Sequence, residues 1–130
     1  MILHNDAVDA ILTRRSIRSY QAKQISEDAL ETILTAGQYA PSGMNQQSAK
    51  AIVVQSKERM QQLVQLAKAA EQVDHNPFYD APTVILVFAD ATQLAPLEDG
   101  CNVLENMMLA AHAIGLGLSL IHISEPTRLA

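Results

Sequence analysis

The fold of this chain is decided by one long stretch, which reads Glu98-Asp99-Gly100-Cys101-Asn102-Val103-Leu104-Glu105-Asn106-Met107-Met108-Leu109-Ala110-Ala111-His112-Ala113-Ile114. Its apolar side chains occupy nearly every side of a helical wheel, so the pattern predicts one long helix over residues 98–114. A helix that is apolar almost all round is buried inside a fold or at a contact between subunits. Gly115 follows directly and is a natural residue for ending this helix.

Patterns elsewhere in the chain predict shorter elements. Amphipathic spacing predicts helices over residues 5–14, 26–37 and 57–72. Short apolar runs predict buried strands at residues 51–54 and 83–89. The second run is continuously apolar, which is typical of a central strand covered on both faces.

The composition fits a single folded domain and excludes several classes of protein. The chain has 130 residues, a hydrophobic fraction of 48% and a formal net charge of -5. Its apolar runs fall well short of the ~20 residues that cross a bilayer, so no membrane partner is expected. The acidic balance disfavours nucleic acid, because no broad basic face can follow the phosphates. The single cysteine, Cys101, cannot form an internal disulfide, so a reducing cytoplasm is the expected location.

Three of the nine basic residues gather in residues 14–18, which we call the arginine segment. Arg14, Arg15 and Arg18 alternate with Ser16 and are followed by Ser19. Guanidinium groups and hydroxyls together suit the oxygens of a phosphate. The alternative is a solvated run of charge after a helix, and the segment alone leaves both interpretations open.

A second polar stretch, residues 41–48, carries no charge, and we call it the amide loop. Asn45, Gln46 and Gln47 offer several donors and acceptors together. Gly43 allows the backbone to approach a ligand closely. Neutral amides suit the edge of a heteroaromatic ring with alternating carbonyls and nitrogens, whereas the alternative is an ordinary surface loop.

Other chemical motifs fail on their context. Gly115 and Gly117 close a helix, whereas the glycines of a dinucleotide loop follow a strand and open a helix. Cys101 lies on the long apolar helix, where we expect a buried structural thiol, and His112 is interpreted as a core or interface histidine. No metal site is expected, because the other histidines are widely separated and lack thiol or carboxylate companions: His4, His75 and His122.

Four segments in this order resemble the landmarks of the FMN-dependent nitroreductase family. Residues 14–20 resemble its Arg-x-Ser-x-Arg/Lys-x-aromatic signature, and residues 41–47 are similar to its Pro-Ser-x-x-Asn-x-Gln segment. Phe78-Tyr79-Asp80-Ala81-Pro82 resembles the landmark that leads into an apolar strand. Residues 106–117 resemble its core helix ending in Gly-Leu-Gly. The resemblance implies an α+β fold with a mixed sheet flanked by helices, incomplete at the C-terminus.

The resemblance also implies a homodimer that binds FMN at the subunit interface. The phosphate and ribityl chain would be held in one subunit by the arginine segment, through Arg14, Arg15, Ser16 and Arg18. The other subunit would line the isoalloxazine with Pro41, Ser42, Gly43, Asn45 and Gln47. Asn76 resembles a flavin-contacting asparagine before the strand.

The activity that the resemblance implies is reduction of nitroaromatics, quinones or related small acceptors by NAD(P)H through ping-pong hydride transfer. No catalytic side chain is expected, since the cofactor carries the chemistry. One alternative is a non-catalytic flavin-binding or dimerisation module. Another is a helical interaction domain without a cofactor.

The last residues depart from the family pattern. Family members continue with a further strand, a helix, a glycine-containing flavin loop and a basic segment. We therefore expect residues 1–117 to form a partial nitroreductase-like FMN-binding domain. Residues 118–130 are interpreted as a tail outside the family, an artefact of translated adapter sequence.

Overall fold

The computed structural model describes residues 1–121 and contains four helices, a short 3-10 turn and two strands. In chain order these are α1 (Asp6–Thr13), α2 (Glu27–Gln38), η1 (Gly43–Asn45), β1 (Ala49–Val54), α3 (Lys57–Glu71), β2 (Val84–Ala89) and α4 (Pro96–Ala113). Each expected helix and strand is present, with bounds shifted by a few residues. Among the described residues no helix is long and apolar enough to cross a membrane. The part of the predicted tail from residue 122 onward lies outside the described residues.

The helices begin where local chemistry satisfies their first backbone N–H groups. Ser26 caps α2 by accepting from the Ala29 N–H at 3.2 Å, and Ser56 caps α3 by accepting from the Arg59 N–H at 3.2 Å. The helix α4 begins at Pro96, two residues before the predicted start, because a proline at the first position has no N–H to leave unpaired.

The sheet of the described chain is an antiparallel pair. The strands β1 and β2 pair from Ala49 opposite Ala89 to Val54 opposite Val84. The extended stretches around Ser16 and Leu118 meet only in one isolated parallel bridge. Residues 1–121 thus contain both antiparallel and parallel pairing, but the parallel pairing is limited to this one bridge.

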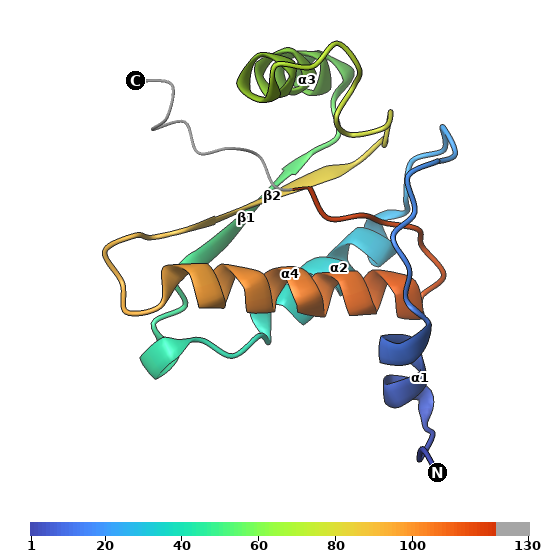
Figure 1. The fold of residues 1–130 in the computed structure, drawn as a ribbon, viewed down its shortest axis with the longest axis vertical. Coiled ribbons are helices and arrows are strands. Elements are labelled where there is room, and N and C mark those ends of the chain that lie inside the picture. Colours follow the sequence, from blue (N-terminus) through green and yellow to red (C-terminus); the bar gives the residue numbers. More distant parts are fainter. Residues whose placement is uncertain (122–130) are drawn as a thin grey trace.

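The core lies between this sheet and the helices α2 and α4, which pack together on one face of it (Figure 1). Its buried centre is formed by Ile33, Met107 and Ala111. Gly37 allows the close approach of α2, because a Cβ atom there would lie 2.8 Å from Cγ of Met107. The prediction that α4 is buried is therefore confirmed for the face that carries Met107 and Ala111.

Two expectations about burial are wrong. Cys101 is exposed, because it lies on the solvent side of α4 and not on the side that faces α2 and the sheet. Within residues 1–121 the strand β2 is not covered on both faces along its whole length: Val87 packs on the core, whereas on the other face Leu86 is half-buried and Phe88 is 55% exposed. Ile52, on the same outer face by register, is 52% exposed. A continuous apolar run therefore did not identify a strand buried on both sides.

Candidate functional site

The amide loop has an unusual backbone for residues other than glycine. Met44, Asn45 and Gln47 have φ angles of 51°, 54° and 50°, all in the left-handed region. Asparagine tolerates this region, but three such residues in one loop are uncommon and store strain. The loop must therefore be held in this shape by its surroundings.

A buried carboxylate on α4 supplies that hold. Oδ1 of Asp99 accepts the Gly43 N–H at 2.9 Å, and its Oδ2 accepts the Ser48 hydroxyl at 2.8 Å. Asp99 is only 2% exposed. The sequence analysis missed this residue, since an acidic side chain in the first turn of a helix is ordinary. No local signal distinguished Asp99 from its neighbour Glu98, which is also acidic and also in the first turn.

The three amides of the loop divide into two kinds. Oε1 of Gln46 accepts the Leu94 N–H at 2.9 Å, so this side chain ties the loop to the segment before α4. The side chains of Asn45 and Gln47 are exposed and make no hydrogen bond with any residue in the described range. Two of the three amides are therefore available to a ligand.

Pro41 and Ser42 shape the start of the loop. The Pro41 carbonyl accepts from Nδ2 of Asn102 on α4 at 3.4 Å. The Ser42 hydroxyl accepts the Gln47 N–H at 3.1 Å, which closes the loop on itself. Gly43 packs tightly, since a Cβ atom there would lie 3.3 Å from the Cβ of Ala95.

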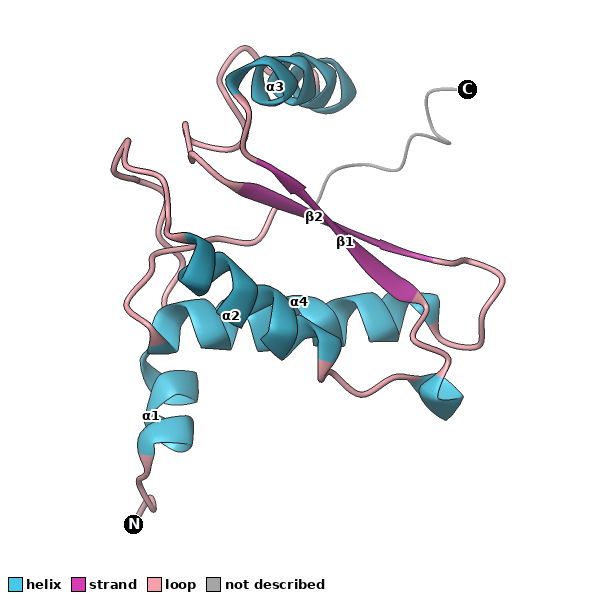
Figure 2. Ribbon diagram, turned by 180° about the vertical axis from the view of Figure 1, so that it is seen from behind, coloured by secondary structure: helices cyan, strands magenta, loops and turns pink. Residues whose placement is uncertain are grey.

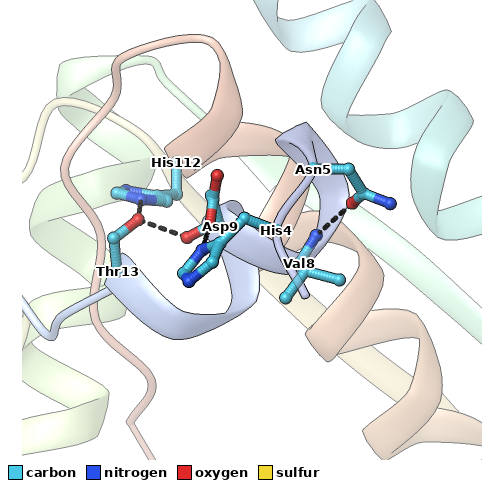
Figure 3. A network of polar contacts seen from close by, with 6 residues as sticks. All are labelled: His4, Asn5, Val8, Asp9, Thr13 and His112. Carbon is cyan, nitrogen blue, oxygen red and sulfur yellow. Dashed lines mark hydrogen bonds and ion pairs between the residues drawn. The ribbon is translucent and has the colours of Figure 1, made fainter. Parts of the chain in front are cut away.

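The arginine segment begins where α1 ends, at the other end of α4. The Thr13 hydroxyl donates to the Asp9 carbonyl at 2.6 Å and lies 2.9 Å from Nε2 of His112 near the C-terminal end of α4 (Figure 3). Because that hydroxyl proton is used on Asp9, the imidazole is the donor of the second bond. His4 extends the network through a 2.6 Å contact between its Nδ1 and the Asp9 carboxylate.

The three arginines of the segment differ in what they contact. Nη1 of Arg15 donates to the carbonyls of Leu12 and Arg14, at 2.9 and 2.7 Å. Arg14 is half-buried and Arg18 is exposed, and their guanidinium groups make no hydrogen bond or ion pair within residues 1–121. Ser16 takes part in the isolated bridge to Leu118. Two guanidinium groups are therefore open to an anion.

Arg18 also belongs to a shallow cavity of about 240 Å³, which is lined in part by His75, Pro77 and Tyr79. Burial raises the pKa of the nearby Tyr20 phenol, although the positive charge of Arg18 partly offsets that rise. Arg18 is thus exposed at a cavity that is lined by an aromatic side chain and also by the carboxylate of Glu71.

Asn76 lies beside this cavity, in the turn between the lining residues His75 and Pro77, and not in the amide loop. Its Oδ1 accepts the Phe78 N–H at 2.9 Å, and its Nδ2 donates to the Asp80 carboxylate at 2.8 Å. Both ends of its amide therefore shape the turn that leads into β2.

The predicted site residues form two groups at opposite ends of α4 (Figures 1 and 2). Asp99 marks the end that holds the amide loop, and His112 marks the end that holds α1. At about 1.5 Å per residue these positions lie roughly 20 Å apart along the helix axis. The structure therefore does not bring the two groups together within one chain.

Comparison with known proteins identifies the family. The sequence model of the Nitroreductase family matches residues 11–129. The chain belongs to the nitroreductase family. The match includes most of the stretch that the sequence analysis interpreted as a tail, and the division at residue 117 stays a prediction.

The chain is similar to curated proteins that are named as flavin reductases. It is 32% identical to the Bacillus subtilis protein named FMN reductase (NAD(P)H), over 88% of this chain and 47% of that protein. It is 30% identical to the NADPH-flavin oxidoreductase of Vibrio harveyi, over 87% of this chain and 52% of that protein. The chain thus spans about half the length of these curated relatives.

Solved structures confirm the expected α+β fold of this nitroreductase family member. A nitroreductase with bound FMN from Bacteroides fragilis superposes with a TM-score of 0.81 at 32% identity, covering 86% of this chain and 67% of that one. An FMN-dependent nitroreductase from Clostridium difficile superposes with a TM-score of 0.79 at 30% identity, over 87% of this chain and 58% of the other.

Proposed function

We propose that this chain is the FMN-binding part of an NAD(P)H oxidoreductase that reduces nitroaromatics, quinones or related acceptors. The observation that carries the proposal is the pair of polar groups at the two ends of α4. Within residues 1–121, one presents neutral amides without hydrogen-bond partners and the other presents guanidinium groups without ion-pair partners. These are the groups that suit the ring and the phosphate of a flavin nucleotide.

The amide loop fits the ring of FMN. Asn45 and Gln47 offer both donors and acceptors, which match the carbonyls and nitrogens at a flavin edge. Pro41, Ser42 and Gly43 belong to the same loop and line the ring with their backbone. Asp99 sets the strained shape of this loop before any ligand binds. A rigid donor set loses little entropy on binding, which favours affinity.

The arginine segment fits the phosphate of FMN. We assign charge-assisted hydrogen bonds to Arg14 and Arg18 and a hydroxyl contact to Ser16. Arg15 contributes less directly, since one of its nitrogens is shared between two backbone carbonyls. Asn76 acts on the ligand only through the turn that it shapes beside Arg18.

We propose that the complete site forms between two copies of the chain. Within one copy the two groups are attached near opposite ends of α4, at helix positions roughly 20 Å apart along its axis, and so do not surround one common site. A two-fold dimer brings the amide loop of one copy to the arginine segment of the other, and it does so twice. Exposed apolar side chains on α1, on α4 and directly after α4 are available to such an interface, namely Ile11, Leu12, Leu97 and Ile114.

Bound FMN would supply the chemistry of a ping-pong cycle, hydride transfer from NAD(P)H and then reduction of the acceptor. The chain itself binds and orients: the amide loop fixes the ring edge and the arginines neutralise the phosphate. We place the activity in the cytoplasm, which is consistent with a single free thiol at Cys101.

The test is an FMN titration followed by an NAD(P)H oxidation assay with a nitroaromatic and a quinone. The proposal expects flavin binding that quenches FMN fluorescence, together with acceptor-dependent turnover. Binding without turnover would support the non-catalytic flavin-binding or dimerisation module instead. Neither binding nor turnover would support an interaction domain without a cofactor.

A further inference from the structure

We propose that Asp99 is a positioning residue that sets the shape of the amide loop and thereby the orientation of Asn45 and Gln47. The inference rests on the proposed function in so far as the loop faces FMN. Asp99 itself does not reach the ligand, because it is 2% exposed and both of its carboxylate oxygens are bonded to the loop.

The two bonds grip the loop on either side of its strained part. Gly43 and Ser48 both reach the same carboxylate, and the three left-handed residues lie between them. The distance between the Gly43 nitrogen and the Ser48 hydroxyl oxygen is therefore limited by one carboxylate group and two hydrogen bonds.

The first bond also fixes a peptide plane. The Gly43 N–H points to Asp99, so the Ser42 carbonyl of the same peptide points the other way. That carbonyl accepts the Asn45 N–H at 3.1 Å. The orientation of Asn45 is thus connected to Asp99 through one rigid peptide group.

Burial separates this role from that of an ordinary helix-start carboxylate. An acidic residue in the first turn is favoured by the helix dipole even when it is fully solvated. Burying it is unfavourable unless hydrogen bonds compensate for the lost water. Here the compensation comes from the loop, so the loop and the carboxylate fix each other.

Because the loop is strained, losing the two hydrogen bonds to Asp99 should change its shape. Residues in the left-handed region persist only where their surroundings over-determine the backbone. Without Asp99, Met44 and Gln47 are free to return to commoner backbone angles. The ligand-facing amides then lose their preset direction, and flavin affinity falls.

The test compares Asp99→Ala with Asp99→Asn. Alanine removes both acceptors, whereas asparagine keeps an acceptor for the Gly43 N–H and its amide can donate to Ser48. The first readout is hydrogen exchange of the backbone amides of residues 43–47 in the chain without FMN. The second is the FMN dissociation constant together with the visible absorption spectrum of bound flavin.

Asp99→Ala should accelerate exchange at Gly43, weaken FMN binding about ten- to a hundredfold and shift the flavin spectrum. Asp99→Asn should leave the exchange rate, the FMN affinity and the flavin spectrum close to those of the unaltered chain. Ser48→Ala removes only one of the two bonds, so it should give an intermediate effect, and it provides a test if Asp99→Ala does not fold. Ile33→Ala is the matched control, because it damages the core without touching the loop.

The proposal is overturned if Asp99→Ala and Ser48→Ala leave exchange and flavin binding unchanged, or if asparagine is as defective as alanine. It is equally overturned if Ile33→Ala shifts the flavin spectrum as much as Asp99→Ala at the same loss of stability. Absence of FMN binding in the unaltered chain would instead defeat the proposed function, while hydrogen exchange would still test the hold of Asp99 on the loop.

Discussion

At one end of α4 the buried Asp99 bonds two positions of the amide loop, whereas at the other end the His112 imidazole has one hydrogen-bond partner within residues 1–121, Thr13, just before the arginine segment. The first attachment fixes a strained backbone, and the second leaves two guanidinium groups without partners in residues 1–121. Hydrogen bonds to a ring edge need exact directions, but attraction between a guanidinium and a phosphate tolerates small displacements. The difference indicates that one binding site has two halves: the amide loop is the rigid half, and the arginine segment is the compliant half.

The largest expected effect comes from removing the charges of the compliant half. The double substitution Arg14→Ala/Arg18→Ala should weaken FMN binding about a hundredfold or more, since each charge-assisted hydrogen bond contributes roughly tenfold or more. Flavin fluorescence titration measures this loss. Arg15→Ala is the matched control and should have a clearly smaller effect, because that side chain contacts backbone carbonyls. Unchanged retention in the double variant would remove the phosphate assignment.

Two further substitutions test whether the amides of the rigid half have different roles. Asn45→Gly keeps a residue suited to the left-handed backbone but deletes the ligand-facing amide, so FMN affinity should fall about tenfold with little change in stability. Gln46→Ala breaks the bond to Leu94 and should instead lower the free energy of unfolding by about 0.5–1.5 kcal/mol. Urea unfolding and FMN titration of both variants distinguish the two roles. Identical behaviour would contradict the division of the amides.

Another substitution tests how compliant the arginine segment is. Thr13→Val deletes the hydroxyl that joins α1 to His112, and stability should fall by about 0.5–1.5 kcal/mol. FMN affinity should change far less than in the arginine double variant, because the guanidinium groups can adjust to the phosphate. The measurement is again urea unfolding beside an FMN titration. A loss as large as that of the double variant would show that this half is rigid as well.

The smallest expected effect concerns Tyr20, whose pKa is raised by burial beside Arg18. As pH rises past the ordinary tyrosine pKa of about 10, the unfolded chain releases this proton before the folded chain does. The stabilising contribution is therefore complete below that pH and is lost as pH rises toward the higher pKa of the folded state. Urea midpoints between about pH 8 and pH 11 should fall more steeply for the unaltered chain than for Tyr20→Phe. Parallel curves would contradict the shift.

Much of the fold follows from local patterns, because caps and apolar periodicity act over a few residues. Ser26 begins α2 as expected, and the predicted long helix corresponds to α4. Burial depends on contacts between residues far apart in the sequence. The predictions that Cys101 is buried and that β2 is covered on both faces were wrong for this reason. The polar segments were identifiable by residue type. Their division was not, because the role of Gln46 depends on a bond to a residue forty-eight positions away.

Asp99 illustrates the same limit. Its position in the first turn of α4 is ordinary, and only the three-dimensional arrangement shows that both oxygens bond to the loop. The two-ended arrangement is also invisible in the order of the motifs, because sequence spacing does not reveal that α4 separates them.

The most direct test of the account is complementation between two damaged chains. One copy carries Arg14→Ala/Arg18→Ala and the other carries Asn45→Gly/Gln47→Gly, each with a different affinity tag, and doubly tagged dimers are isolated after co-expression. If each flavin is held by the amide loop of one copy and the arginine segment of the other, the mixed dimer retains one intact site. It should then bind about half the flavin of the unaltered dimer, while either variant alone binds almost none. Mixed dimers that bind no more flavin than the separate variants would contradict a site shared between two chains.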